Sequence, residues 1–211
     1  MNRFEKSKNF IALSDDEIKT IIFSDEFKFP LFDPDKTSSV WRKPSTGLQK
    51  KNLTPTVKYG GGSVMVWGCF SYHGVGRLVF IDGIMDATKY VNILSNNLYA
   101  SANLMGLDSF IFQQDNDPKH TSKVARHFFE RKNINLLDWP AQSPDMNPIE
   151  NFWSIIKRKR SKIQARNIEE LKAILTEIWY SIPKETCESY ALSFKKRAIK
   201  VYNAKGGHID Y

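Results

Sequence analysis

The stretch SVMVWGCF (63–70) is almost continuously apolar, and it restricts the possible folds of this chain more than any other feature. A strand with one wet face alternates polar and apolar residues, whereas an unbroken apolar run indicates a strand buried on both faces. A glycine-containing turn and the strand-like stretch GRLVFID (76–82) follow it, which predicts a hairpin. We therefore expect residues 63–70 to form a central strand of a sheet.

Four other short stretches have the composition of strands. TIIFSD (20–25) ends in Asp25, FIFQQ (110–114) ends just before Asp115, and INLLDW (134–139) is short. EFKFPLF (26–32) alternates but contains a proline, which cannot donate a ladder hydrogen bond, so it predicts a separate edge strand.

Apolar residues at helical spacing dominate much of the remaining sequence, together with a polar, helical lead-in at 1–19. The second predicted helix has Asp117 as its N-cap and Pro118 at its first position. Strands, then alternating helix and strand, then helices predict an α/β fold with a mixed sheet and a helical cover. The predicted helices are 86–106, 119–132, 148–165, 168–181 and 184–204.

Residues 33–62 form a long polar segment rich in Pro, Lys, Thr and Gly, and they end in three glycines. Long segments without periodicity are usually functional or disordered. Its basic residues are candidates for DNA contact, and a disordered surface loop is the alternative. These residues are Lys43, Lys50, Lys51 and Lys58.

The net charge of +8 is unevenly distributed. Residues 1–118 hold 13 basic and 13 acidic side chains, whereas residues 119–211 hold 18 basic and 10 acidic ones. A one-sided basic field suggests a polyanion partner, with nucleic acid first and an acidic membrane surface second, although net charge also serves solubility. No apolar run reaches membrane-spanning length, so we expect no membrane segment. Two cysteines without metal-ligand spacing favour a reducing compartment.

The basic run KRKRSK (157–162) lies on a predicted helix whose apolar stripe faces the core. This run is interpreted as a DNA-contacting face, a nuclear localisation patch or a solvated face. DNA contact is favoured because the same helix begins with Glu150, a candidate metal ligand. The expected contacts are Lys157, Arg158, Lys159 and Lys162. The expected stripe comprises Ile149, Phe152, Trp153, Ile156 and Ile163. Three tryptophans are expected in the core, namely Trp139, Trp153 and Trp179.

Three carboxylates stand at the ends of predicted elements. Asp25 and Asp115 end strands, and Glu150 lies in NPIENFW, where Asn147 and Glu150 match a capping box. Taken singly, such acids are more often turn or cap residues than ligands. Together, and without a Cys or His cluster, they suit Mg²⁺ or Mn²⁺. Two such ions about 3.5–4 Å apart promote phosphodiester cleavage.

Four motifs in order resemble the catalytic domain of the Tc/mariner DNA transposases: FSDE, GGGSVMVWG, FQQDNDPKH and DWPAQSPDMNPIENFW. The resemblance covers about residues 21–211. It implies a ribonuclease H-like fold and an Asp25, Asp115 and Glu150 triad that binds two Mg²⁺ or Mn²⁺ ions. It also implies cut-and-paste transposition, with double-stranded DNA as partner at transposon ends and at TA target steps. A nuclear location is expected, and residues 33–62 resemble a region that reaches a partner subunit, so a homodimer is possible.

Four residues near the acids have other candidate roles. His120 either contacts DNA or a catalytic carboxylate, or it is an ordinary helix-start residue. Lys119 is a candidate DNA contact. Asp117 is expected to cap a helix rather than to bind metal. Asp145 is a reserve ligand for which a loop-stabilising role is favoured.

Full-length Tc/mariner transposases carry paired helix-turn-helix modules ahead of the catalytic domain. About twenty residues precede the first predicted strand here, so we expect end recognition to be missing or supplied elsewhere. A dissected domain, a truncated element copy and an adopted host protein all fit. The expected organisation is a lead-in at 1–19 and a catalytic domain at 20–211. The alternative functions are a non-catalytic DNA-binding protein and a structure-specific nuclease of the same fold.

Overall fold

The computed structural model describes residues 2–32 and 61–210, and a five-stranded mixed sheet forms its centre. The strand order is β3-β2-β1-β4-β5, with β1 antiparallel to β2 and parallel to β4. The predicted α/β fold with a mixed sheet is confirmed. The strands are β1 (Ile21–Pro30), β2 (Ser63–Ser71), β3 (Gly74–Ile81), β4 (Ile111–Gln113) and β5 (Asn135–Leu136).

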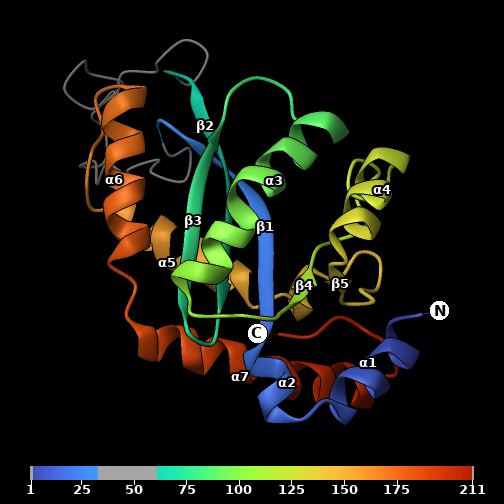
Figure 1. Ribbon diagram of the computed structural model, residues 1–211. Helices are drawn as coiled ribbons and strands as arrows, with labels where there is room; N and C mark the ends of the chain where they lie inside the picture. Colours follow the sequence, from blue (N-terminus) through green and yellow to red (C-terminus); the bar gives the residue numbers. More distant parts are fainter. Residues whose placement is uncertain (1, 33–60, 211) are drawn as a thin grey trace, which may run out of the picture.

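Helices cover both faces of this sheet (Figure 1). One apolar core joins the sheet to α3 and α4, and the other joins it to α5, α6 and α7. Among the described residues, no helix is long and apolar enough to span a bilayer. The helices are α1 (Arg3–Ala12), α2 (Asp15–Lys19), α3 (Ala87–Leu104), α4 (Lys123–Lys132), α5 (Ile149–Arg160), α6 (Ile168–Tyr180) and α7 (Lys184–Asn203), with a 3₁₀ turn, η3, at Pro144–Met146.

The apolar run predicted to be a central strand is β2, and it is buried on both faces. Trp67 belongs to the core under α3 and α4, whereas Phe70 belongs to the core under α5–α7. Gly68 lies between them, and a Cβ there would be 2.8 Å from the Trp153 ring and 3.0 Å from the Trp179 ring. The missing side chain thus lets two tryptophans from α5 and α6 reach the sheet.

The prediction that a strand ends at Asp25 is wrong, because β1 is continuous to Pro30, and the edge strand predicted at 26–32 is the second half of β1. Its second half pairs with β2 alone, since β4 pairs only with residues 21–23 of β1. The Leu31 N–H donates to the Gly62 carbonyl at 2.9 Å, so the ring nitrogen of Pro30 faces away from β2. A proline is tolerated there because no strand of the described residues lies on that side.

The predicted start of the helix at 119–132 is also wrong. Helix α4 begins at Lys123, and its N-cap is Ser122, whose hydroxyl accepts from the Ala125 N–H at 3.2 Å. Asp117 instead stabilises the preceding turn, where its carboxylate accepts from the Lys119 N–H at 2.9 Å. Two capping residues compete in this segment, and the later one starts the helix.

The other helix predictions are confirmed, although α5 ends at Arg160 rather than near residue 165. The helical lead-in forms α1 and α2, and α1 packs on α7 through Phe4, which stacks on Tyr202, and Phe10, which contacts Phe194. The three tryptophans predicted to lie in the core are buried. Most of the segment predicted at 33–62, with its four lysines, lies outside the described residues.

Candidate active site

The three carboxylates singled out in the sequence lie on segments that meet where the parallel pair of strands ends. The last β1–β4 pair is Phe23 with Gln113. Asp25 follows two residues later in β1, and Asp115 follows two residues after β4. Glu150 lies in the first turn of α5, which packs against β1. Segments far apart in the sequence thus bring three acids to one edge of the sheet.

Asp25 and Glu150 affect each other: the charge of Glu150 acts on the pKa of Asp25, and a hydrogen bond with Asp25 acts on the pKa of Glu150. Burial raises the pKa of Asp25 well above its usual range, and the charges of Glu26, Glu150 and Asp115 raise it further. Burial also raises the pKa of Glu150, against the opposing effects of that hydrogen bond, Lys157 and Arg197. The site therefore concentrates negative charge that a proton, or a bound cation, relieves.

His120 lies between two carboxylates. Its Nδ1 is 2.5 Å from Asp115 Oδ1, and its Nε2 is 3.3 Å from Glu26 Oε1. Burial lowers the pKa of His120, but the hydrogen bonds and charges of Asp115 and Glu26 outweigh it and raise the pKa to about 9. Of the interpretations considered above, His120 thus makes the carboxylate contact, from a turn that precedes α4, and it is an imidazolium at neutral pH.

The same contact acts on Asp115. Burial raises the pKa of this carboxyl, but the hydrogen bonds from His120 and from the Asp117 N–H, with the charges of His120 and Lys119, hold it below its usual range. Asp115 is therefore ionised at neutral pH, and its side chain is 53% exposed. Its carboxylate is oriented by His120, whose ring packs on Tyr90 with ring centroids 4.0 Å apart.

Glu26 is a site residue that sequence reasoning missed. Its side chain is 8% exposed and forms ion pairs with His120 and with Lys119, whose Nζ lies 3.4 Å away. Neighbouring residues of a strand point to opposite faces, so Glu26 turns away from the face of Asp25. The signal was present in FSDE, but it required β1 to continue past Asp25. Lys119, predicted to contact DNA, pairs here with Glu26 and with Asp117.

The capping box predicted at the start of α5 is not formed. Pro148 is the N-cap, and the Asn147 side chain accepts from the Ile149 N–H at 3.3 Å instead of from Glu150. The Asn147 amide also donates to the Ser24 carbonyl at 3.2 Å. The Asn147 N–H, from which the Glu150 carboxylate would accept in a capping box, donates instead to the Pro144 carbonyl at 2.9 Å, so Glu150 does not cap the helix.

Asp145, the reserve ligand, has the loop-stabilising role that was favoured. Its carboxylate accepts from Arg3 at 2.6 and 2.7 Å and from the Ile209 N–H at 2.9 Å. These bonds hold the loop before α5 against both the first helix and the C-terminal residues.

The basic run at 157–162 lies mainly on the outer face of α5, as predicted. Lys157, Arg158 and Lys162 are exposed, and Lys157 Nζ lies 4.4 Å from the centroid of the Phe27 ring. Lys159 is half-buried and donates to the Ser181 hydroxyl at 3.2 Å. The placement of Ile163 in the apolar stripe is wrong, because it lies beyond the end of α5 and is 46% exposed.

The arrangement of the acids determines whether they fit a metal. In residues 2–32 and 61–210, no group of three or more His, Cys, Asp or Glu side chains is already arranged to hold an ion. Asp115 is turned toward His120, and Asp25 Oδ1 accepts from the Glu26 N–H at 2.7 Å. The carboxylate oxygens of these acids, whose negative charges repel one another, are nevertheless the donors that hard divalent cations prefer.

Comparison with known proteins places the chain among enzymes that act on DNA. The family model described as DDE superfamily endonuclease matches residues 20–172. The Tcb1 transposase of Caenorhabditis briggsae is 42% identical over 211 residues, which cover 99% of this chain and 77% of that protein. The Tc1 transposase of Caenorhabditis elegans is 43% identical over 190 residues, which cover 90% of this chain and 70% of that protein.

Solved structures share the same fold. The paired-end complex of the Mos1 mariner transposase with Mn superposes with a TM-score of 0.85 at 18% identity, over 99% of this chain and 63% of that one. The isolated Mos1 catalytic domain superposes with a TM-score of 0.77 at 17% identity, over 99% of this chain and 94% of that domain. The described fold therefore corresponds to a mariner catalytic domain, and the chain spans less than two thirds of the full-length mariner chain.

Proposed function

This chain belongs to the DDE superfamily of endonucleases, as a Tc1-like transposase catalytic domain, and we propose that it hydrolyses phosphodiester bonds in DNA and joins the freed 3′-hydroxyl to target DNA. The observation that carries the proposal is that Asp25, Asp115 and Glu150 lie on segments that meet where the β1–β4 pairing ends, with α5 packed on β1. Acids that come together from three distant segments are the ligand set that metal-dependent phosphodiester cleavage uses.

Asp25, Asp115 and Glu150 would hold divalent ions, which we propose to be two Mg²⁺ or Mn²⁺ ions. When bound, such ions activate water and stabilise the charge that develops on the phosphate. The Mos1 transposase catalytic domain has been solved with Mg and with Mn, which supports this choice of metal.

The protein residues prepare the site in two ways. The raised pKa of Asp25 means that its carboxyl gives up a proton only at higher pH than an ordinary aspartate, so protonation competes with cation binding. His120 holds Asp115 through Nδ1 and Glu26 through Nε2, and this fixes the direction of the Asp115 carboxylate. Water and the 3′-hydroxyl are the proposed nucleophiles, so no covalent enzyme–DNA intermediate is needed.

The proposed partner is double-stranded DNA, at transposon ends and at TA target steps. Support comes from the exposed basic residues Lys157, Arg158 and Lys162, close to Glu150 on the same segment. Basic side chains of this kind contact phosphates regardless of base sequence. The Mos1 transposase has been solved as a paired-end complex with a left transposon end, which supports DNA as the partner class. A homodimer and a nuclear location are part of the same proposal.

Nicking of supercoiled plasmid tests the function. The chain should convert supercoiled to open-circular DNA with Mg²⁺ or Mn²⁺ and not with chelator, and Glu150→Gln should abolish the conversion. DNA binding without nicking, on plasmid and on pre-nicked element-end DNA alike, would instead indicate a non-catalytic DNA-binding protein. Metal-dependent cleavage of branched DNA in preference to element ends would indicate a structure-specific nuclease.

A further inference from the structure

A chain of buried polar contacts links the three segments that carry the acids. Gln113, Ser24 and Asn147 are 0%, 3% and 4% exposed. The Ser24 N–H donates to Gln113 Oε1 at 3.1 Å, and the Ser24 hydroxyl donates to the Gln113 carbonyl at 2.8 Å. The Ser24 carbonyl accepts from Asn147 Nδ2 at 3.2 Å. These three residues, which we call the polar bridge, thus connect β4, β1 and the start of α5.

Each member of the polar bridge lies next to an acid in the sequence. Ser24 directly precedes Asp25, and Gln113 is two residues before Asp115. Asn147 reaches the third acid through Oδ1, which accepts from the N–H of Ile149, the residue before Glu150. A shift at any one of these contacts therefore moves a carboxylate relative to the other two.

Gln113 extends the sheet by one contact beyond its backbone ladder. The β1–β4 pairing ends at Phe23 with Gln113, so Ser24 has no backbone partner on that side. The Gln113 side chain supplies the acceptor in its place. Its Nε2 is buried without a hydrogen-bond partner in the described structure, which costs free energy. The side-chain amide of Gln113 thus has only one of its two polar atoms hydrogen-bonded, so its own hydrogen bonding does not explain why a glutamine is present.

We propose that Gln113, Ser24 and Asn147 are positioning residues that set the spacing of Asp25, Asp115 and Glu150 without touching substrate. The inference rests on the proposed function, because the spacing matters only if the three acids act together. The competing explanation is local: Asn147 would simply start α5, and Gln113 would simply fill the sheet. The two explanations differ in what happens to the acids when a bridge contact is removed.

The main test is Asn147→Ala, which removes both the donor to Ser24 and the acceptor for Ile149. The matched control is Asn167→Ala, which removes the N-cap of α6, where Asn167 Oδ1 accepts from the Glu170 N–H at 2.8 Å. Crystal structures of both metal-free variants give the Asp25–Glu150 separation. Calorimetry with Mn²⁺ gives the metal affinity, and plasmid nicking gives kcat and KM.

We expect Asn147→Ala to move the Glu150 carboxyl away from Asp25 by about 1 Å, a shift that can cost about 100-fold in rate. Mn²⁺ affinity should fall about 10–100-fold, as for other residues that orient metal ligands. The value of kcat should fall while KM for DNA stays the same, and Asn167→Ala should change none of these. An unchanged separation, or equal losses in both variants, would overturn the proposal.

Two further arms cover the remaining outcomes. If Asn147→Ala does not fold, Gln113→Met removes the acceptor for Ser24 at similar side-chain length, and the separation of Asp25 and Asp115 becomes the readout. An unchanged separation there would also overturn the proposal. If the unmutated chain neither binds Mn²⁺ nor nicks DNA, the proposed function fails, while the crystallographic separations still decide whether the polar bridge sets the spacing.

Discussion

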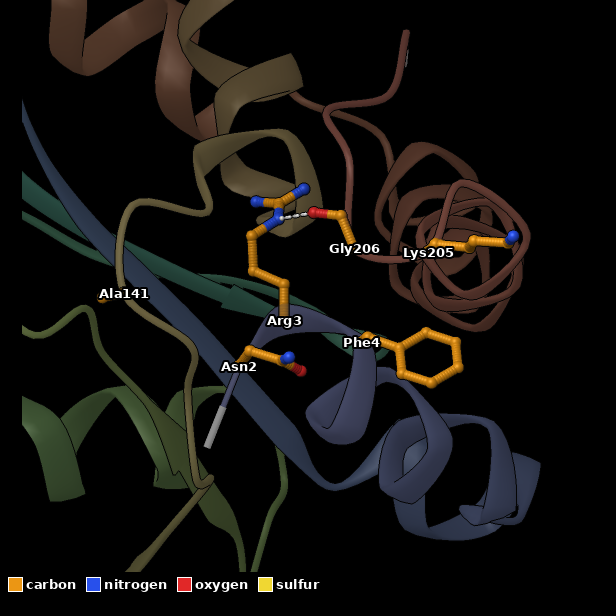
Figure 2. Close-up of a pocket in the computed structure, with 6 residues that line it drawn as sticks. All are labelled: Asn2, Arg3, Phe4, Ala141, Lys205 and Gly206. Carbon is orange, nitrogen blue, oxygen red and sulfur yellow. Dashed lines mark hydrogen bonds between the residues drawn. The ribbon is translucent and has the colours of Figure 1, made fainter.

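Arg3 and Asp145, 142 residues apart, form a two-pronged ion pair with Nη1 2.7 Å from Oδ1 and Nη2 2.6 Å from Oδ2. Arg3 Nε also donates to the Gly206 carbonyl at 2.9 Å, the bond drawn in Figure 2, and Nη2 donates to the Gly207 carbonyl at 3.1 Å. One side chain thus joins the first helix, the loop before α5 and the residues after α7. That loop leads directly to Glu150, so the site depends on contacts far from it.

The Asp145 ion pair should make stability depend on acid pH. Burial raises the pKa of Asp145, but the hydrogen bonds from Arg3 and the Ile209 N–H, with the charges of Arg3 and His208, hold it below its usual range. A depressed folded-state pKa contributes stability above the unfolded value of about 3.9, and this contribution is lost as pH falls through the folded value. Asp145→Asn should cost about 3–5 kcal/mol at pH 7.

Urea unfolding at pH 7, 5 and 3 measures this effect. The difference in free energy of unfolding between the unmutated chain and Asp145→Asn should be the same at pH 7 and 5 and should shrink at pH 3. Glu5→Gln, in an exposed pair with Lys8, serves as the control and should change little at any pH. A difference that stays constant down to pH 3 would show that Asp145 acts through packing rather than through its charge.

Gly68→Ala should destabilise the fold. The added Cβ would come within 2.8 Å of the Trp153 ring and 3.0 Å of the Trp179 ring, both of which are large and buried. Overpacking of this kind costs about 1–3 kcal/mol. Thermal unfolding should show a lower Tm. The comparison variant is Gly83→Ala, at an open position with a positive φ of 69°, where an added Cβ causes backbone strain rather than steric contact. A Tm equal to that of the unmutated chain would mean that α5 and α6 can retreat from the sheet at no cost.

Asp115→Asn should abolish metal-dependent cleavage while the fold persists. Asn keeps the size of the side chain and removes its charge, so the site loses one anionic ligand. The loss should be at least the roughly 100-fold that removal of a supporting residue can cost. Plasmid nicking and a thermal melt on the same samples give activity and stability. If Asp115 were only a turn residue, Asn would serve nearly as well, and full activity would remove Asp115 from the mechanism.

Replacing Arg158 and Lys162 with Gln should weaken DNA binding without changing the fold. Both side chains are exposed. Each lost phosphate contact should reduce the slope of log affinity against log salt by about 0.9, so the double variant should lose about 1.8. Fluorescence anisotropy with duplex DNA at several salt concentrations measures it. The control is Lys132→Gln at the end of α4. An equal loss of slope per residue there would indicate nonspecific attraction by net charge rather than contact at the basic run 157–162.

Patterns confined to one segment could be predicted from the sequence. The unbroken apolar run of β2 and the helical spacing of α3, α6 and α7 depend only on which faces are buried, and each was confirmed. The positions of Asp115 just after a strand and of Glu150 in the first turn of a helix were equally visible. The confirmed resemblance to Tc/mariner catalytic domains rested on four motifs, each of which is one continuous stretch of sequence.

Features that depend on a neighbour distant in the sequence could not be predicted. Whether a proline fits at position 30 of β1 depends on which side β4 covers, and whether Asn147 forms a capping box with Glu150 depends on its bonds to Pro144 and Ser24. The role of Glu26 became visible only once β1 was known to pass through Asp25. The start of α4 was wrong for a different reason, since Asp117 and Ser122 both satisfy the local rules for a cap.

The packing of α1 on α7 has a consequence for the order in which the chain can fold during synthesis. Arg3 and Gly206 are 203 residues apart, so at roughly 5–20 residues per second about 10–40 s pass on the ribosome between them. A ten-residue helix is marginal on its own, so α1 lacks the support of α7 until α7 emerges. Until then Phe10 has no Phe194 to cover it, and the nascent chain presents an apolar segment that a ribosome-associated chaperone can bind.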